Sequence, residues 1–464
     1  MYLLNANALH LPLSDNTVQA CITSPPYWGL RDYGTAKWTG GDPACEHMVG
    51  NQVQDNKAPG AIASGIHPGV DASICRKCGA TRIDAQLGLE PVPDCLGWAT
   101  GQPCGVCYVC HMVAVFREVR RVLRPNGTLW LNLGDSYAGS WGNYGARNGN
   151  QRSRISERYH RPAYEDRQNG WSGLPPTANV QGLKPKNLVG IPWRVALALQ
   201  ADGWYLRSDV IWHKPNPMPE SVTDRPTKAH EYFFLLSKSE QYYYDAEAVR
   251  EPLAESTLAD KRNGTGRHTQ GKEYSKYFDE SAPGETSPDL PSWYRGKTFV
   301  NPEAGRNRRS VWTVATKPYS GAHFATFPPT LVEVPVLAST SPKACPHCRA
   351  PWERVMEKET FSLSSEERER QGRTNTMAHA GKTAQQSGYS WTPPVVKGER
   401  WQPTCTCAEN DGSGKCLVLD PFSGTATVGR VCLEKGRAYV GAELNPAYLE
   451  LAKQRTSAVQ VELL

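Results

Sequence analysis

Apolar side chains recur at two different periods along the chain, and these periods predict its strands and helices. Val18, Ala20 and Ile22 alternate with their neighbours, which predicts a strand that must end at Pro25-Pro26 because proline has no amide proton to donate. Residues 111–124 have apolar side chains at helical spacing and predict an amphipathic helix that ends at Pro125-Asn126-Gly127. The same reasoning predicts strands at Thr128–Leu133, Tyr205–His213 and Glu231–Leu236, and helices at residues 188–202 and 330–338.

The C-terminal segment alternates regularly between strand and helix patterns. Leu417–Asp420 is a short apolar run that predicts a strand, and a glycine-containing turn and a helix that ends at Gly436 follow it. Tyr439–Glu443 predicts a second strand, and Asn445-Pro446 places a capping residue and a helix-starting proline before the last helix. Strands that alternate with helices predict an α/β fold, in which helices cover the faces of a sheet.

The composition is that of a globular, loop-rich chain. Its 464 residues suffice for about three domains, and 39% of them are apolar. The combined share of its 41 Gly and 36 Pro exceeds the average of roughly 12%, which predicts many turns and loops. No run of 18 apolar residues is present and the N-terminus lacks the features of a signal peptide, so we expect a cytoplasmic protein without a membrane span. The net charge of +6 permits an anionic partner without requiring one.

Fourteen cysteines in such a chain are expected to be metal ligands or free thiols rather than disulfides. Two groups have the paired spacing of structural zinc sites, and reduced free cysteines are the alternative for each. The expected ligands are Cys45, His47, Cys75 and Cys78 at the first site, and Cys345, Cys348, Cys405 and Cys407 at the second. Metal binding is left open for a third group of Cys95, Cys104, Cys107 and Cys110, in which His111 can substitute for one thiol. Iron–sulfur ligation is less favoured than zinc.

The turn after Asp420 has the position of a ligand-binding turn, since it follows a strand and opens a helix. Gly424 would let a ligand approach the backbone closely, and Glu443, at the end of the next strand, suits a ribose diol because a carboxylate accepts two hydroxyl hydrogen bonds. The alternative is an ordinary strand–turn–helix with a buried acid. The glycine patterns typical of NAD-binding and ATP-binding turns are absent from the sequence.

The segment Thr23-Ser24-Pro25-Pro26-Tyr27 carries the groups needed to hold a planar amine at the end of a strand. The two prolines stiffen the loop, the Ser24 hydroxyl and nearby carbonyls can accept hydrogen bonds from an exocyclic amine, and Tyr27 can stack on a base. For this segment alone, a simple turn or polyproline element is the alternative.

Together, the Ser-Pro-Pro-Tyr and Asp-Pro-Phe-Ser-Gly-Thr segments resemble the DNA amino methyltransferases, in the permuted order of their β group. The resemblance implies a Rossmann-like α/β fold and methyl transfer from S-adenosylmethionine to cytosine N4 or adenine N6 of a flipped base. It extends to Trp212–Ser221, beside the base pocket, and to His323–Pro328, which closes the cofactor pocket. The implied catalytic residues are Ser24, Pro25, Pro26 and Tyr27, and the implied cofactor-binding residues are Thr326, Phe327, Asp420, Phe422, Gly424, Thr425, Glu443 and Asn445.

Two positions depart from the family pattern. Ala426 stands where the family usually has a second glycine, and Asn5-Ala6-Asn7-Ala8 stands where a Gly-Asp pair is common. Serine before Pro-Pro-Tyr favours cytosine in this family, where aspartate favours adenine, so N4 methylation of cytosine is expected and N6 methylation of adenine is the alternative. Methylation of RNA or protein, and a non-catalytic zinc-containing DNA-binding module, are further alternatives.

The expected partner is double-stranded DNA in a prokaryotic or phage-infected cell, in an orphan, phage or restriction–modification role. Eight Lys and Arg against three Asp and Glu in residues 141–190, and Arg306-Asn307-Arg308-Arg309, are candidates for phosphate contacts. The methyltransferase domain is assigned to residues 1–40, 111–245 (with a basic loop at 139–186), 311–342 and 411–464. Residues 41–110 and 343–410 are assigned as zinc-binding, zinc-ribbon-like insertions, and residues 246–310 as the target-recognition segment.

Overall fold

The computed structural model describes the residues that form the central sheet and the helices that pack on it. The described residues are 1–29, 37–45, 75, 77–83, 86–88, 90, 92–138, 183–184, 186–253, 305–316, 328–359 and 395–462. The chain divides into two compact units. The first comprises Met1–Tyr244, Arg309–Pro351 and Cys405–Leu464, and the second comprises Asp245–Arg308 and Trp352–Thr404.

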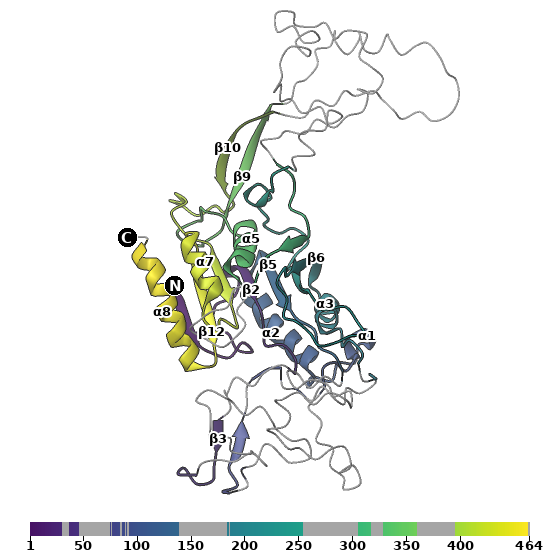
Figure 1. Ribbon diagram of the computed structural model, residues 1–464. Coiled ribbons are helices and arrows are strands. Elements are labelled where there is room, and N and C mark those ends of the chain that lie inside the picture. Colours follow the sequence, from purple (N-terminus) through teal and green to yellow (C-terminus); the bar gives the residue numbers. More distant parts are fainter. Residues whose placement is uncertain are drawn as a thin grey trace, which may run out of the picture. The chain divides into compact units, whose positions relative to one another are not determined.

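An eight-stranded mixed sheet forms the centre of the first unit (Figure 1). Its strand order is β1-β12-β11-β2-β5-β7-β6-β8, in which β1, β12, β11, β2 and β5 run parallel and β7 is antiparallel to both β5 and β6. The bounds are β1 (Tyr2–Asn5), β12 (Ala438–Glu443), β11 (Leu417–Asp420), β2 (Val18–Thr23), β5 (Leu123–Leu133), β7 (His230–Ser237), β6 (Tyr205–His213) and β8 (Val311–Thr313). The predicted α/β fold is confirmed.

Near the centre of the sheet, a strand from the C-terminal part of the sequence pairs with a strand from the N-terminal part. β11 pairs in parallel with β2, with Val418 opposite Ala20 and Leu419 opposite Cys21. Because parallel strands end at the same edge of a sheet, the turn after Asp420 and the segment after Thr23 emerge side by side. Every residue of β2 is buried, since a central parallel strand is covered on both faces, whereas its alternating sequence would also suit a half-exposed strand.

Helices cover both faces of the sheet (Figure 1). On one face, α2 (Tyr108–Val122) and α3 (Ile191–Ala201) pack on each other, and Phe116 of α2 shares an apolar cluster with Leu129 and Leu131 of β5. On the other face lie α5 (Pro329–Ser339), α7 (Thr427–Glu434) and α8 (Pro446–Glu462). Trp130, which points to this second face, donates its indole N–H to Ser339 Oγ of α5 at 2.8 Å.

The predicted end of the 111–124 helix was wrong by two residues. α2 ends at Val122, and β5 begins at Leu123 and runs through Pro125, so the chain passes from helix to strand without a separate turn. A residue before proline is disfavoured in the helical region, which excludes Arg124 from the helix. The helix also begins earlier, at Tyr108, with Cys107 as its N-cap.

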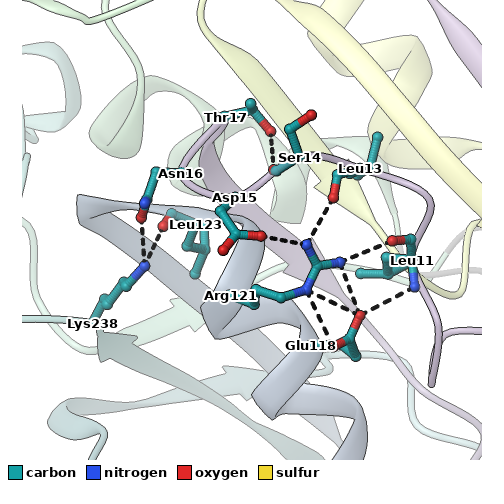
Figure 2. A network of polar contacts seen from close by, with 10 residues as sticks. All are labelled: Leu11, Leu13, Ser14, Asp15, Asn16, Thr17, Glu118, Arg121, Leu123 and Lys238. Atoms are coloured by element: carbon teal, nitrogen blue, oxygen red, sulfur yellow. Dashed lines mark hydrogen bonds and ion pairs between the residues drawn. The ribbon is translucent and has the colours of Figure 1, made fainter.

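The segment between β1 and β2 is held against α2 by one arginine (Figure 2). The Arg121 guanidinium donates to the carbonyls of Leu11 at 2.9 Å and Leu13 at 2.8 Å, and to Asp15 Oδ1 at 2.6 Å. It also donates to Glu118 one helical turn away, and this hydrogen bond lowers the pKa of Glu118. Arg121 therefore ties the chain that leads into the central strand β2 to the helix that covers it.

The remaining elements are short helices and two-stranded sheets in both units. In the first unit, α1 (Gly97–Thr100) precedes α2, and β3 (Lys37–Thr39) pairs antiparallel with β4 (Thr81–Ile83). In the second unit, β9 (Trp352–Glu359) pairs antiparallel with β10 (Val395–Pro403), and a short 3-10 helix, η3, covers Glu247–Val249. Among the described helices, none is both long and apolar enough to cross a membrane. Most of the predicted basic loop and of the predicted target-recognition segment lies outside the described residues.

Candidate active site

The segment after β2 is built around a polar network that involves Ser24 and Tyr27. The Ser24 hydroxyl donates to Asn132 Oδ1 at 3.3 Å, and the Tyr27 hydroxyl lies 2.9 Å from the same oxygen and 2.7 Å from Glu231 Oε2. Ser24 and Tyr27 are half-buried, whereas Asn132 is 1% exposed. The two prolines between them remove backbone donors and limit the conformations of the segment, which keeps both hydroxyls near Asn132.

The ring of Tyr27 is seated against the backbone of Gly134. A Cβ atom at residue 134 would lie 2.5 Å from Cε2 of Tyr27, a distance that a real side chain does not reach. Glycine at this position therefore allows the chain that leaves β5 to pass directly beside the ring. Together with the hydroxyl contacts, this packing determines where Tyr27 lies; its expected stacking on a base stays a prediction.

Asn132, Glu231 and Lys214 belong to this network, although none of them was among the predicted site residues; Lys214 lies in the segment Trp212–Ser221, which was expected beside the base pocket. Asn132 Nδ2 donates to the Tyr232 carbonyl at 3.0 Å, and Lys214 forms an ion pair with Glu231. The Lys214 ammonium also lies 4.3 Å from the ring centroid of Trp212. One signal was available in the sequence, because a polar Asn132 interrupts the apolar strand Thr128–Leu133.

Asp420 links the turn after β11 to the strand that leads into Ser24. Its Oδ1 accepts the Thr23 hydroxyl proton at 2.7 Å and the Phe422 amide at 3.1 Å. The side chain is 2% exposed, and burial, opposed by these two hydrogen bonds, raises the pKa of Asp420 to about 7. Asp420 Oδ1 therefore connects the turn after β11 to the end of β2.

Glu443 and Gly424 face one another at the same edge of the sheet. Glu443 Oε2 accepts the Gly424 amide and Oε1 accepts the Asn445 amide, both at 2.9 Å. Burial raises the pKa of Glu443, and the backbone donors of Asn445 and Gly424 oppose that shift. Gly424 has a φ of 49°, and no atom of the described residues would lie within 4 Å of a Cβ built there. Each carboxylate oxygen keeps a second lone pair that can accept a ribose hydroxyl, so these acceptors and the open backbone at Gly424 fit the ribose of S-adenosylmethionine.

The other expected cofactor residues differ in their placement. Thr425 is buried, and its Oγ1 accepts from Arg455 at 2.9 Å; Asn445 caps α8 by accepting the Ala447 amide at 2.9 Å, as its position before Pro446 predicted. Phe422 is half-buried against the apolar cluster of the sheet. Thr326 and Phe327 lie outside the described residues.

Ala426, which stands where the family usually has a second glycine, adopts the backbone conformation that glycine favours. Its φ is 55°, in the left-handed region, and it is the N-cap residue of α7. Glycine adopts this conformation without steric cost, whereas alanine is strained there by about 1–2 kcal/mol. The turn therefore keeps the backbone shape that a second glycine would favour.

In the first unit, the cysteine sulfurs converge in three separate groups. The Sγ atoms of each group all lie within 4.8 Å of one another, and the groups are Cys45, Cys75 and Cys78; Cys345, Cys348, Cys405 and Cys407; and Cys95, Cys104, Cys107 and Cys110. His47, the expected fourth ligand of the first group, lies outside the described residues. Both predicted pairs of the second group converge, although 56 residues separate Cys348 from Cys405 in the sequence. Each group has the soft donors that zinc prefers.

Comparison with known proteins identifies the family. Residues 18–345 and 409–454 match the DNA methylase family of N6- and N4-methyltransferases. The chain is 32% identical over 443 residues to the Type II methyltransferase M.Cfr9I of Citrobacter freundii, covering 96% of this chain and 82% of that protein. It is 30% identical over 442 residues to the Type II methyltransferase M.SmaI of Serratia marcescens, covering 95% and 85% respectively. The solved PvuII DNA methyltransferase (cytosine-N4-specific) aligns with 99% of this chain and 89% of its own, at a TM-score of 0.41 and 11% identity. The chain therefore belongs to the DNA methylase family and is an S-adenosylmethionine-dependent DNA amino methyltransferase.

Proposed function

We propose that the protein methylates the N4 atom of a cytosine flipped out of double-stranded DNA at a specific site. The observation that carries the proposal is the position of Ser24-Pro25-Pro26-Tyr27 at the end of β2, directly beside the cofactor turn that follows β11. Serine at the first position of this motif supports cytosine over adenine. The Type II designation of M.Cfr9I and M.SmaI supports a role in restriction–modification.

The polar network supports a defined role for Ser24. A hydroxyl has one proton, and Ser24 Oγ lies 3.3 Å from Asn132 Oδ1 and 3.4 Å from the Tyr27 hydroxyl oxygen. We assign the proton to the Asn132 amide oxygen, and donation there leaves the lone pairs of Ser24 Oγ as acceptors for a substrate amine. An acceptor at this point would hydrogen-bond an N–H of the amine and favour sp³ geometry at the nitrogen, in which the lone pair is less delocalised into the ring and is a better nucleophile. Asn132 thus acts as a positioning residue that sets the direction of the Ser24 proton.

The cofactor turn would hold S-adenosylmethionine through Glu443 and the backbone at Gly424. The bound cofactor supplies an electrophilic methyl group on its sulfonium. Thr23 and Asp420 hold the two strand ends together through their hydrogen bond at 2.7 Å, so they keep the amine-binding segment and the cofactor turn in a constant relation. Positioning of this kind supplies a large part of the rate enhancement in a direct transfer.

We also propose that the two predicted cysteine sites bind structural zinc. At Cys345, Cys348, Cys405 and Cys407, the four sulfurs satisfy a tetrahedral ion without further ligands. At Cys45, Cys75 and Cys78, His47 supplies the fourth ligand by the spacing of the sequence. Zinc would close the long loops between the cysteine pairs and so stabilise chain segments that have little apolar core of their own.

The decisive experiment is mass spectrometry of nucleosides from plasmid DNA that was expressed with the protein in a host without DNA methylation. N4-methylcytosine is expected, and N6-methyladenine would replace the cytosine assignment. Ser24→Ala should abolish the product while the variant still binds S-adenosylmethionine. If a folded, cofactor-bound protein yields neither methylated base, that result would contradict a DNA substrate and favour RNA or protein.

Asn132→Ala tests the positioning role separately. Without the acceptor, the Ser24 proton is no longer directed, and the loss of one such hydrogen bond predicts a turnover number about five- to tenfold lower. Steady-state kinetics on a methylatable duplex would measure it, with the exposed Asp224→Asn variant as a control. Unaltered turnover in Asn132→Ala would remove Asn132 from the mechanism.

A further inference from the structure

Four cysteines that have no role in the site described above surround the start of α2. Cys95 Sγ lies 3.8 Å from Cys110 Sγ, and Cys104 Sγ lies 3.9 Å from the same atom. All four sulfurs, including that of Cys107, lie within 4.8 Å of one another. These distances exclude disulfides, in which the sulfurs are about 2.05 Å apart.

The distances match those around one tetrahedral ion. A zinc–sulfur bond of about 2.3 Å places the corners of the tetrahedron about 3.8 Å apart. In an iron–sulfur cube, by contrast, each cysteine binds a different iron, and the cysteine sulfurs are spread farther apart. The arrangement of Cys95, Cys104, Cys107 and Cys110 therefore fits a single ion.

Backbone amides point at these sulfurs, which favours the thiolate form that a metal requires. The amides of Gly97 and Cys104 donate to Cys95 Sγ at 3.3 and 3.4 Å. The amides of Val106 and Cys107 donate to Cys104 Sγ at 3.4 and 3.3 Å, and the Cys110 amide donates to Cys107 Sγ at 3.4 Å. Five such contacts within sixteen residues stabilise negative charge on three of the four sulfurs.

The same turn of α2 touches the segment that carries Ser24. Tyr108, which follows Cys107 and is fully buried, donates its hydroxyl proton to the Pro26 carbonyl at 2.8 Å. His111, which follows Cys110, lies 2.9 Å from Glu90 Oε1 through its Nδ1. The Glu90 carbonyl in turn accepts the indole proton of Trp28 at 2.8 Å. His111 is therefore engaged with Glu90, and the four thiols are the ligand set.

We propose that Cys95, Cys104, Cys107 and Cys110 bind one zinc ion that fixes the first turn of α2 and, through Tyr108, positions the Pro26 carbonyl in the amine-binding segment. The metal site stands on the sulfur geometry alone. The positioning of Pro26 rests on the proposed function, because it matters for catalysis only if the segment binds the substrate amine.

Metal content tests the first half of the proposal. Cys95→Ser/Cys104→Ser removes the two less buried ligands, and purified full-length variant should contain about one zinc equivalent less than the wild type. Cys432→Ala, in which a buried core cysteine is removed, should leave the zinc content unchanged. Equal zinc in the double variant and the wild type, or iron in place of zinc, would overturn the assignment.

Alkylation of the wild-type protein is a second test of the metal site, and it does not depend on whether the double variant folds. Cys104 is exposed, so as a free thiol it would react readily with iodoacetamide. As a zinc ligand it should be protected, and peptide mapping should detect its alkylation only after chelation. Full labelling of Cys104 without a chelator would contradict the site.

Tyr108→Phe tests the second half, because it removes one hydroxyl and keeps the buried ring. Zinc content and S-adenosylmethionine affinity should be unchanged, while the turnover number falls about two- to tenfold, as expected for one lost hydrogen bond. Tyr205→Phe, at an exposed position on β6, is the matched control. Unchanged turnover in Tyr108→Phe would refute the positioning role.

Hydrogen exchange separates this role from the activity itself. Tyr108→Phe should speed amide exchange at Tyr27 to Gly29 even if the wild type shows no methylation of DNA. Unaltered exchange would show that Tyr108 does not hold the segment, whatever the substrate. Failure of the proposed function would instead appear as an inactive wild type with intact zinc and a protected segment.

Discussion

Asp420→Asn should make the stability of the protein less sensitive to pH, because it removes a buried acid beneath the cofactor turn. The Asp420 carboxyl is 2% exposed, and burial raises its pKa from an ordinary 3.8 to about 7. Below pH 3.8 it is protonated in both states and carries no penalty. Between 3.8 and about 7 only the unfolded state ionises, so the free energy of unfolding falls as pH rises; above about 7 the penalty is constant.

The size of the effect follows from the pKa difference. At about 1.36 kcal/mol per pKa unit, ionisation of Asp420 costs about 4 kcal/mol at pH 8 and about 1.6 kcal/mol at pH 5. Asparagine has no titratable group and keeps an acceptor for the Thr23 hydroxyl. The variant should therefore gain about 2.5 kcal/mol relative to the wild type between pH 5 and pH 8.

Urea unfolding followed by tryptophan fluorescence at the two pH values would measure this difference. Any constant cost of burying the asparagine amide cancels, because only the change with pH is compared. In the control Asp224→Asn, the hydrogen bond from Lys186 lowers the pKa of Asp224, so that group is ionised in both states and its effect should not vary from pH 5 to pH 8. The same effect of Asp420→Asn at both pH values would refute the reasoning, since it would mean that Asp420 is already ionised in the folded protein at pH 5.

Three further predictions concern the cofactor, the fold and the metals. Glu443→Ala should weaken S-adenosylmethionine binding about 10- to 100-fold by calorimetry, because charged hydrogen bonds are lost; an unchanged affinity would remove the ribose role. Arg121→Ala should lower the free energy of unfolding by about 1–3 kcal/mol, because the carbonyls of Leu11 and Leu13 lose their donor; Arg121→Lys should recover part of it, and wild-type stability in Arg121→Ala would contradict the anchoring role. Chelation should lower the melting temperature as zinc is released. A melting curve that chelation does not shift, together with no metal in the purified protein, would refute the zinc sites.

Local patterns in the sequence determined most of the sheet and the motifs at its edge. Tyr205–His213 and Leu417–Asp420 were predicted with the bounds that the structure has. Leu417–Asp420 is an almost continuous apolar run, which identifies a buried strand, whereas Tyr205–His213 was recognised from its aromatic and β-branched residues. The turn at Gly424 was recognised because backbone conformation leaves a mark in residue type. The helix end near Arg124 was misplaced, since propensity and the effect of a following proline compete there.

Contacts between distant parts of the chain were decided only by the tertiary structure. Thr23 and Asp420, 397 positions apart, meet because β2 and β11 are neighbours in the sheet, and strand order is not written in any local pattern. Asn132, Glu231 and Lys214 join Tyr27 from three separate segments, and no spacing in the sequence relates them. The sequence by itself determined which residues can do chemistry, through residue type and local periodicity. The packing of the sheet decided which of them act together, because hydrogen bonds and burial depend on distance in space.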